Sequence, residues 1–345
     1  MQIKDVVLSK GLTGFYFDDQ QAIRLGKYVE NGLSYDGDPV TPGFINIRQA
    51  GESVSVQLIL ENGQVAYGDC AAVQYSGAGG RDPLFLADDY IPLIEEYIVP
   101  VLVGRELSSF RALAEEVDQI RNGNGKPMHT AIRYGVTQAI LDAVAKARGL
   151  TMAEVIVDEY GLDLVVEPVL IFSQSGDDRK LNADRMIIKH VDVLPHGLFN
   201  NVNKLGKNGE LLKDYLVWLK ARVQELKVIP DYLPDFHVDV YGTIGEAFKN
   251  NVKKIGDYVK ELAELVAPHK LVIEGPVDCG SRQEQIRAMA ELRAYVDENN
   301  IPVKFVADEW CNTLADIRDF TDAKAGHMIQ IKIQWKPCCI ANKTV

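Results

Sequence analysis

Three acidic residues stand at nearly equal intervals in the second half of the chain, each at the end of a short apolar run. Asp239 lies in FHVDVYG, Glu274 in LVIEGP and Asp308 in KFVADEW, so the intervals are 274 − 239 = 35 and 308 − 274 = 34 residues. One strand–helix unit of an eightfold barrel averages roughly 31 residues. This spacing predicts that the carboxylates end successive strands and converge on one face, where Mg²⁺, which prefers oxygen ligands, would offset their repulsion. Each acid alone could instead cap a helix or pair with a surface lysine.

The next apolar run, HMIQIK, ends at Lys332, which follows Asp308 by 332 − 308 = 24 residues. Side chains alternate between the two faces of a strand, so Gln330 and Lys332 are expected to share the face that forms the barrel interior or its mouth. Beside a metal and away from water, the pKa of a lysine falls, and its neutral amine can act as a general base. The alternative is a lysine that reaches solvent from the end of the strand.

From Glu167 onward, short β-branched runs alternate with amphipathic helical stretches. This alternation predicts an α/β architecture of parallel strand–helix–strand units. The expected strands are Val169–Phe172, Met186–Lys189, Phe236–Val240, Leu271–Glu274, Val303–Ala307 and Met328–Lys332. The expected helices include Gly209–Lys227, Val252–Ala267, Arg282–Asn299 and Thr313–Thr321. The pair Asp177-Asp178 is predicted to cap the N-terminus of a helix.

Residues 1–165 have the mixed pattern of an α+β domain. Two alternating runs, Gly43–Gln49 and Ser53–Glu61, predict a hairpin or meander. The turns are expected at Gly51-Glu52 and at Asn62-Gly63, the second of which is a strong hairpin signal.

Three helices are predicted in the same region from the spacing of apolar residues. They are Pro83–Val103, Ser109–Arg121 and His129–Arg148. Gly149 is expected to end the last helix as its C-cap. The stretch from Gly77 to Gly80 lacks the Lys-Ser/Thr of a phosphate-binding loop and is predicted to form a hinged lid.

The composition excludes several classes of protein. The 345 residues suffice for two domains, and the formal net charge of −12 argues against nucleic-acid binding, which needs a basic surface. The start, MQIKDVVLSKGLTGFYFDD, lacks the apolar core of a signal peptide, and no run of about 18 apolar residues predicts a membrane span. The cytoplasm is therefore the expected location. Five scattered cysteines, among them the adjacent Cys338 and Cys339, are expected to be free thiols.

Six long segments carry a specific resemblance to one family of proteins. They are GLTGFYFDDQ (Gly11–Gln20), GDCAAVQYSGAGGRDPLF (Gly68–Phe85), HTAIRYGVTQAILDAVAK (His129–Lys146), QSGDDR (Gln174–Arg179), HVDVYGTIG (His237–Gly245) and VADEWCNT (Val306–Thr313). These segments resemble the methylaspartate ammonia-lyases of the enolase superfamily, and the similarity covers about residues 1–332. The resemblance implies an α/β protein in which an α+β capping domain, residues 1–165, precedes a TIM-barrel catalytic domain, residues 166–332.

The resemblance also implies a reaction. The family eliminates ammonia from 3-methylaspartate to give mesaconate, with Mg²⁺ as cofactor and a monovalent cation such as K⁺ as a further activator. By position, the residues that resemble the Mg²⁺ ligands are Asp239, Glu274 and Asp308. The implied assembly is a homodimer that acts on a small amino acid and binds neither nucleic acid nor membranes.

Further residues resemble the family's catalytic and substrate-binding groups. Lys332 resembles the base that removes the C3 proton of the usual substrate epimer. His196, in VDVLPH, resembles the residue on the opposite face of the substrate, which is assigned to the other C3 epimer and to carboxylate binding. The remaining residues that resemble substrate contacts are Gln74, from the capping domain, Gln174 and Gln330.

After Lys332 the sequence IQWKPCCIANKTV no longer resembles the family. Six strands are expected where closure of the barrel needs eight, so the expected barrel is incomplete, and residues 333–345 are expected to form a tail. A non-catalytic remnant of the lyase is therefore one alternative. Another is a dehydratase or racemase of the same superfamily acting on a carboxylate. Such enzymes often carry Lys-x-Lys on the second barrel strand, which is absent from Ile187–Val191 (IIKHV).

Overall fold

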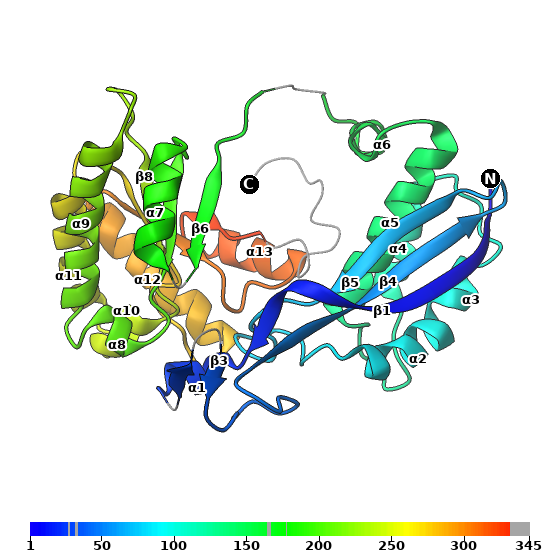
Figure 1. Ribbon diagram of the computed structural model, residues 1–345, viewed down its shortest axis with the longest axis horizontal. Coiled ribbons are helices and arrows are strands. Elements are labelled where there is room, and N and C mark those ends of the chain that lie inside the picture. The colour runs from blue at the N-terminus through cyan, green and yellow to red at the C-terminus, as the bar shows by residue number, and fades with distance from the viewer. Residues whose placement is uncertain (27, 32–33, 164–166, 177, 332–345) are drawn as a thin grey trace. The chain divides into compact units, whose positions relative to one another are not determined.

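The computed structural model describes residues 1–345 apart from residues 27, 32–33, 164–166, 177 and 332–345. The chain divides into two compact units (Figure 1). The first comprises Met1–Ala22, Tyr28–Val166 and Ile331–Val345, and the second comprises Ile23–Lys27 and Glu167–Gln330. The chain therefore enters the second unit twice, first by a short segment that begins within helix α1 (Gln20–Arg24) at Ile23.

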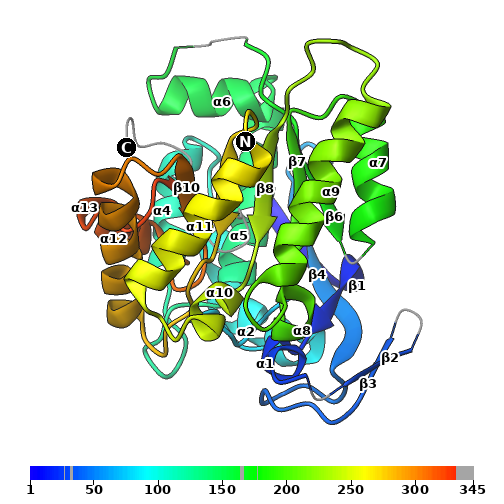
Figure 2. The same ribbon diagram turned by 90° about the vertical axis from the view of Figure 1, so that its left-hand side faces the viewer.

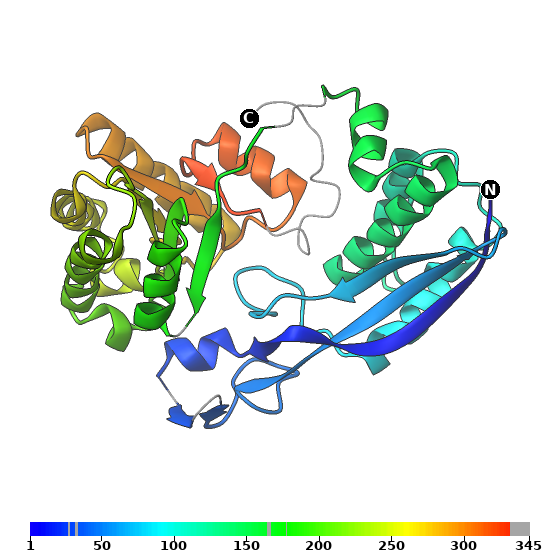
Figure 3. The same cartoon turned by 45° about the horizontal axis from the view of Figure 1, so that its top comes forward.

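A three-stranded antiparallel sheet, in the order β1-β4-β5, forms one layer of the first unit, and helices form the other (Figure 3). The strands are β1 (Ile3–Asp18), β4 (Arg48–Leu60) and β5 (Val65–Ala71), with β2 (Val29–Asn31) and β3 (Ser34–Asp36) in a separate ribbon. The helices are α2 (Ala87–Tyr97), α3 (Val99–Leu102), α4 (Phe110–Gln119), α5 (Thr130–Arg148) and α6 (Met152–Glu159). Between the layers lies an apolar core in which Val56, Leu58 and Ile140 are fully buried.

The hairpin predicted at Asn62-Gly63 is confirmed. Strands β4 and β5 pair antiparallel on either side of it, and Gly63 adopts φ +84°, which favours glycine. The turn predicted at Gly51-Glu52 is wrong, because both residues lie inside β4. A Cβ on Gly51 would stand 2.2 Å from the Oγ1 of Thr13, so this glycine allows β1 to approach β4. Of the run Gly43–Gln49, only the last two residues belong to β4.

The helix predictions for this unit are largely confirmed. Helices α4 and α5 agree with the predicted ranges to within two residues, and Gly149 caps α5 in the left-handed conformation, with φ +65°. The predicted helix Pro83–Val103 is divided into α2 and α3 at Ile98. Pro100 lies in the first turn of α3, where its missing N–H is tolerated. The stretch from Gly77 to Gly80 consists of turns and bends, and its role as a lid stays a prediction.

Strand β5 and helix α5 approach each other closely at two glycines. A Cβ added to Gly135 would stand 2.4 Å from the backbone nitrogen of Cys70, and one added to Gly68 would stand 2.0 Å from the backbone oxygen of Gly135. Backbone atoms in the middle of a strand and a helix cannot turn aside as the end of a flexible side chain can. The two glycines therefore set the distance between the sheet and its central helix.

We expect Gly135→Ala to lower the free energy of unfolding by about 1–3 kcal/mol, because overpacking forces the backbone to shift. This loss exceeds the roughly 1 kcal/mol by which alanine favours a helix over glycine. Urea unfolding measures the change. The matched control is Gly14→Ala, since a Cβ there would meet no atom within 4 Å. Equal midpoints for the two variants would contradict the tight contact.

The second unit contains a six-stranded parallel sheet in the order β11-β10-β9-β8-β7-β6. Its strands are β6 (Phe172–Gly176), β7 (Val193–Leu198), β8 (Asp235–Asp239), β9 (Leu271–Glu274), β10 (Val303–Ala307) and β11 (Met328–Ile329). The helices are α7 (Arg179–Ile188), α8 (Val202–Leu205), α9 (Glu210–Leu226), α10 (Thr243–Ala247), α11 (Val252–Val266), α12 (Arg282–Glu298) and α13 (Leu314–Asp322). Helices α7, α9, α11 and α12 form a row along one side of the sheet, each in contact with the next (Figure 2).

One predicted strand of this unit is wrong. Residues Met186–Lys189 end α7 and begin the turn after it, and the strand at this place in the order is β7. Ala183, Met186 and Ile187 are buried at the i, i+3, i+4 spacing of a helix face. Strand β7 reads VLPHGL, and its proline and glycine are both depleted in strands, so its composition does not predict it.

The other strand predictions of the second unit agree more closely with the structure. The ranges Leu271–Glu274 and Val303–Ala307 are confirmed to the residue, and β8 begins and ends one residue before the predicted range. Strand β6 begins at Phe172, where the predicted run ends. Asp178 caps α7, its side chain accepting from the backbone nitrogen of Leu181, whereas Asp177 lies outside the described residues.

Candidate active site

The three acids stand together at the carboxyl edge of the parallel sheet. Asp239 is the last residue of β8, Glu274 is the last residue of β9, and the two are opposite each other in the strand register. Asp308 directly follows β10, whose Val306 pairs with Glu274. All three side chains are buried, at 1%, 0% and 1% exposure. Neighbouring parallel strands end at the same edge, so the 34- and 35-residue intervals bring the carboxylates side by side.

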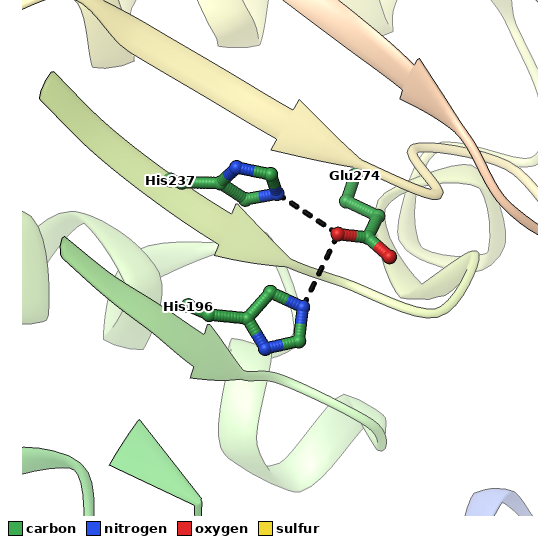
Figure 4. Close-up of side chains that lie close together, drawn as sticks. All are labelled: His196, His237 and Glu274. Atoms are coloured by element: carbon green, nitrogen blue, oxygen red, sulfur yellow. Dashed lines mark hydrogen bonds and ion pairs between the residues drawn. The ribbon is translucent and has the colours of Figure 1, made fainter. Parts of the chain in front are cut away.

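Two histidines hydrogen-bond to one of these carboxylates (Figure 4). The Nε2 of His237, from β8, donates to Glu274 Oε2 at 2.9 Å, and the Nε2 of His196, from β7, donates to the same oxygen at 3.1 Å. His196 Nε2 also lies 3.3 Å from Asp239 Oδ2. Both rings are buried. His196 therefore contacts two of the three acids, and His237 contacts Glu274 alone among them.

The charge of the site favours a bound cation. Burial opposes the charge on the His196 ring, but the hydrogen bonds that the ring donates to Asp239 and Glu274 outweigh it and raise the histidine pKa to about 10. The three carboxylates carry like charge and lie together at the ends of neighbouring strands. Buried charge of one sign is costly unless a counter-ion pairs with it. The donor set therefore fits a divalent metal with oxygen ligands.

Two of the glutamines identified from the sequence stand at the same edge. Gln174 lies on β6 and is paired in register with His196, and its side chain is exposed. Gln330 directly follows β11, and its backbone nitrogen donates to Ala307 at 2.9 Å, one residue before Asp308. Gln330 therefore follows the strand next to β10, which precedes Asp308, and Gln174 lies on the strand next to β7, which carries His196.

The place of the remaining two predicted residues relative to this edge stays a prediction. Gln74 belongs to the first unit, where its Nε2 donates to Asp18 Oδ2 at 2.6 Å. Arg48 makes two further hydrogen bonds, both of 2.7 Å, to the same carboxylate. The side chain of Gln74 is thus held by a buried ion pair. Lys332 lies outside the described residues.

Two buried residues at the site were missed by sequence reasoning. His237 precedes Asp239 by two positions in the same strand, so period-two alternation places both side chains on one face, a signal that could have found it. Glu309 follows Asp308 and is 1% exposed. A Cβ on Gly275 would stand 2.9 Å from Glu309 Oε2 and 3.7 Å from Asp239 Oδ1, so Glu309 reaches toward the acids. No spacing rule in the sequence predicts that approach.

An arginine links the loops that follow the acid-bearing strands. Arg24, from the short segment by which the chain first enters the second unit, forms ion pairs with Asp278 and Glu246. Asp278 lies in the loop after β9, and Glu246 lies in α10, after β8. Trp310, in the loop after β10, donates from its Nε1 to Asp278 at 3.2 Å. These contacts connect the chain segments that leave the three strands.

Two family models match the sequence, and together they span most of it. The methylaspartate ammonia-lyase N-terminus matches residues 1–161, and the methylaspartate ammonia-lyase C-terminus matches residues 163–337. The chain belongs to the methylaspartate ammonia-lyase family. The methylaspartate ammonia-lyase of Clostridium tetanomorphum is 58% identical over 333 residues, which are 96% of this chain and 80% of that protein.

Solved structures support the same assignment. The β-methylaspartase of Clostridium tetanomorphum, a Mg complex, is 57% identical with a TM-score of 0.86, over 97% of this chain and 81% of that one. The Citrobacter amalonaticus methylaspartate ammonia-lyase containing (2S,3S)-3-methylaspartic acid is 52% identical with a TM-score of 0.92, over the same shares. The L-Ala-D/L-Glu epimerase of Bacillus subtilis, 15% identical with a TM-score of 0.63 over 97% and 76%, shares the fold alone. The predicted family and its α/β fold are confirmed.

Membership of the methylaspartate ammonia-lyase family favours a lyase over the dehydratase, racemase and non-catalytic alternatives. The stretch Ile187–Val191, predicted as the second strand, lies at the end of α7 and in the turn after it. The second strand, β7, reads VLPHGL and contains no lysine, so the absence of Lys-x-Lys still disfavours those reactions. Among the described helices, none is long and apolar enough to cross a membrane.

Proposed function

We propose that this chain eliminates ammonia from 3-methylaspartate to give mesaconate at the carboxyl edge of the β6–β11 sheet. The observation that carries the proposal is the cluster of three buried carboxylates, Asp239, Glu274 and Asp308, at the ends of neighbouring strands. In a member of the methylaspartate ammonia-lyase family, this cluster is where a metal-assisted reaction on a dicarboxylate would take place.

The three carboxylates would hold Mg²⁺. Their oxygens are the hard ligands that this ion prefers. When bound, the ion supplies positive charge that makes the proton next to a substrate carboxylate easier to remove. The chain's own contribution is to keep the ligands dry and in place, which the burial of all three side chains achieves.

Lys332 would remove the C3 proton. Its neutral Nζ takes the proton, the electrons of the C3–H bond form the C2=C3 double bond, and the C2–N bond breaks to release ammonia. The role rests on the family resemblance and on the position of Lys332 two residues after Gln330, which stands at the carboxyl edge. A positioned general base typically contributes about 10²–10⁴-fold to the rate.

His196 would hold a substrate carboxylate and face the opposite side of C3. Its Nδ1 has no hydrogen-bond partner among the described residues, so this atom is available to a ligand. The nearby Gln174, paired with it in register, would add an amide hydrogen bond. Gln330 and Gln74 would complete the substrate contacts, the second of them from the capping domain.

Further proposals rest on the family resemblance. We assign residues 1–165 to a capping domain, residues 166–332 to the catalytic barrel and residues 333–345, which lie outside the described residues, to a tail. We also propose K⁺ as an activator, a homodimer as the assembly, and the cytoplasm as the location.

The test of this function is to incubate the purified chain with 3-methylaspartate and Mg²⁺. We expect ammonia and an ultraviolet-absorbing conjugated diacid in equal amounts, with both stopped by a chelator and restored by added Mg²⁺. Loss of stereochemistry at the substrate without ammonia would favour the racemase alternative. A folded chain, checked by circular dichroism, that releases no ammonia at any Mg²⁺ concentration would contradict the proposal.

A further inference from the structure

A cavity of about 320 Å³ lies in the helical layer of the second unit. Its lining side chains come from the start of α7, from α8 and from α9, and α9 contacts both of the other helices (Figure 2). None of the described residues that line it belongs to the proposed active site. Cavities that hold small ligands measure about 300–1,000 Å³, so this one admits a ligand of modest size.

Cationic side chains gather at this cavity although the chain as a whole has a formal net charge of −12. Those that line it are Arg179, Lys180 and Lys204. The Cζ of Arg179 lies 4.4 Å from the ring centroid of Phe199, a stacked arrangement that leaves the in-plane N–H groups of the guanidinium able to donate. Asp184, one turn beyond Lys180 on α7, is bound by Arg222 at 2.7 and 2.9 Å. The cavity therefore suits an anion with several charged oxygens, such as a phosphate.

Aromatic side chains of α9 form another part of the lining. The rings of Tyr215 and Trp218 have centroids 5.6 Å apart and are tilted by 32°. The Nζ of Lys180 lies 5.4 Å from the centroid of the Trp218 ring, so a cation stands at the face of the indole. Lys180 is exposed, and its flexible stem lets the ammonium move from the ring to a phosphate. The indole can then stack on a flat heterocycle, as aromatic side chains do with nucleic-acid bases.

Two polar side chains of the lining suit the hydroxyl groups of a sugar. Asp214 lies one turn before Trp218 on α9, and its carboxylate can accept from sugar hydroxyls, as acidic residues do for ribose. The amide of Asn203 can both donate and accept. The lining thus combines cations, hydroxyl acceptors and an aromatic face.

We propose that this cavity binds a nucleoside phosphate. The three cations hold the phosphates, Asp214 accepts from the sugar, and Trp218 stacks on the base. A small dicarboxylate would pair with the cations alone and would leave the aromatic part of the cavity unfilled. The site is independent of the proposed lyase reaction, because it shares no lining residue with the active site.

The experiment titrates the chelator-treated wild-type chain with ADP, inorganic pyrophosphate and adenosine by calorimetry at about 0.1 M salt. Without divalent ions the phosphates cannot bind through a metal at the acid cluster, so the outcome does not depend on lyase activity. We expect ADP to bind at least about tenfold more tightly than either other probe, because it alone reaches both the cations and the indole. The proposal would be overturned if ADP bound no more tightly than pyrophosphate or adenosine, or gave no heat up to about 1 mM.

Two variants separate the parts of the site. Trp218→Leu should weaken ADP binding by about 5- to 150-fold and pyrophosphate binding by less than about twofold, since stacking involves the base alone. Lys180→Gln should weaken the binding of both probes by about tenfold, as loss of a charge-assisted hydrogen bond does. The matched control, Lys189→Gln, removes the same charge from the C-cap of α7, about 13 Å along the helix and beyond the screening length, and should alter neither affinity. Equal effects of the two lysine variants, or an unchanged ADP affinity in Trp218→Leu, would contradict the proposed site.

Discussion

Asp308→Asn is expected to lower kcat/KM for ammonia release by about 10³-fold or more at a fixed Mg²⁺ concentration. The substitution keeps the size of the side chain and removes one charged ligand from the proposed metal site. A catalytic metal stabilises the transition state by several kcal/mol, and about 1.4 kcal/mol corresponds to a factor of ten. Steady-state rates over a range of Mg²⁺ concentrations measure both the loss of activity and the rise in the concentration that half-saturates the enzyme.

Although Asp308→Asn should be less active than the wild type, it should be more stable when no metal is bound. In a chelator, Asp308→Asn should raise the melting temperature, because it removes one of several like charges buried together. Mg²⁺ at 100 times its dissociation constant should stabilise the wild type by about 2.7 kcal/mol and the variant by much less. Asp235→Asn, at the opposite end of β8, is the control and should change neither value. If Mg²⁺ stabilised Asp308→Asn as much as it stabilises the wild type, Asp308 would not be a ligand of the metal.

Lys332→Ala should lower kcat by about 10²–10⁴-fold, because no water molecule replaces a positioned base. KM should change far less, since the metal and the glutamines still hold the substrate. The rate at which the C3 hydrogen exchanges in heavy water should fall together with the rate of ammonia release. A variant that was slow only in releasing ammonia would still exchange this hydrogen.

The matched control for Lys332 is Lys304→Ala. Lys304 lies near the start of β10, four residues before Asp308 at its carboxyl end, and its side chain is exposed. Its replacement should leave kcat within about twofold, as for an ordinary surface substitution of under 0.5 kcal/mol. Exchange of the C3 hydrogen at the normal rate in Lys332→Ala would show that another group is the base.

Sequence periodicity located the acids because the strands that carry them are typical of buried parallel strands. Leu271–Glu274 and Val303–Ala307 are short β-branched runs with every residue but one buried, and each is followed at once by an acid or ends in one. Parallel order then requires the carboxylates to meet at one edge. The sequence alone could thus predict Asp239, Glu274 and Asp308 as neighbours.

Other features depend on tertiary contacts that periodicity does not record. A four-residue apolar run such as Met186–Lys189 fits either a buried strand or the last turn of a helix, and the helix is preferred here because Met186 and Ile187 complete its buried face. Strand β1 is mostly exposed and lacks the alternation that would predict it. The carboxylate of Glu309 lies against Gly275, where a Cβ would stand 2.9 Å from its Oε2.

The ion pairs of Arg24 have a consequence for how the chain is made. Arg24 is synthesised 222 residues before Glu246 and 254 residues before Asp278. At roughly 5–20 residues per second, it waits about 10–50 s on the ribosome for its second partner. The first unit can form most of its sheet and helices during that time, while residues 23–27 must stay accessible. A fragment that starts at Glu167 would leave Asp278 and Glu246 without this arginine, so adding a peptide of residues 20–28 to such a fragment should restore part of its lost stability.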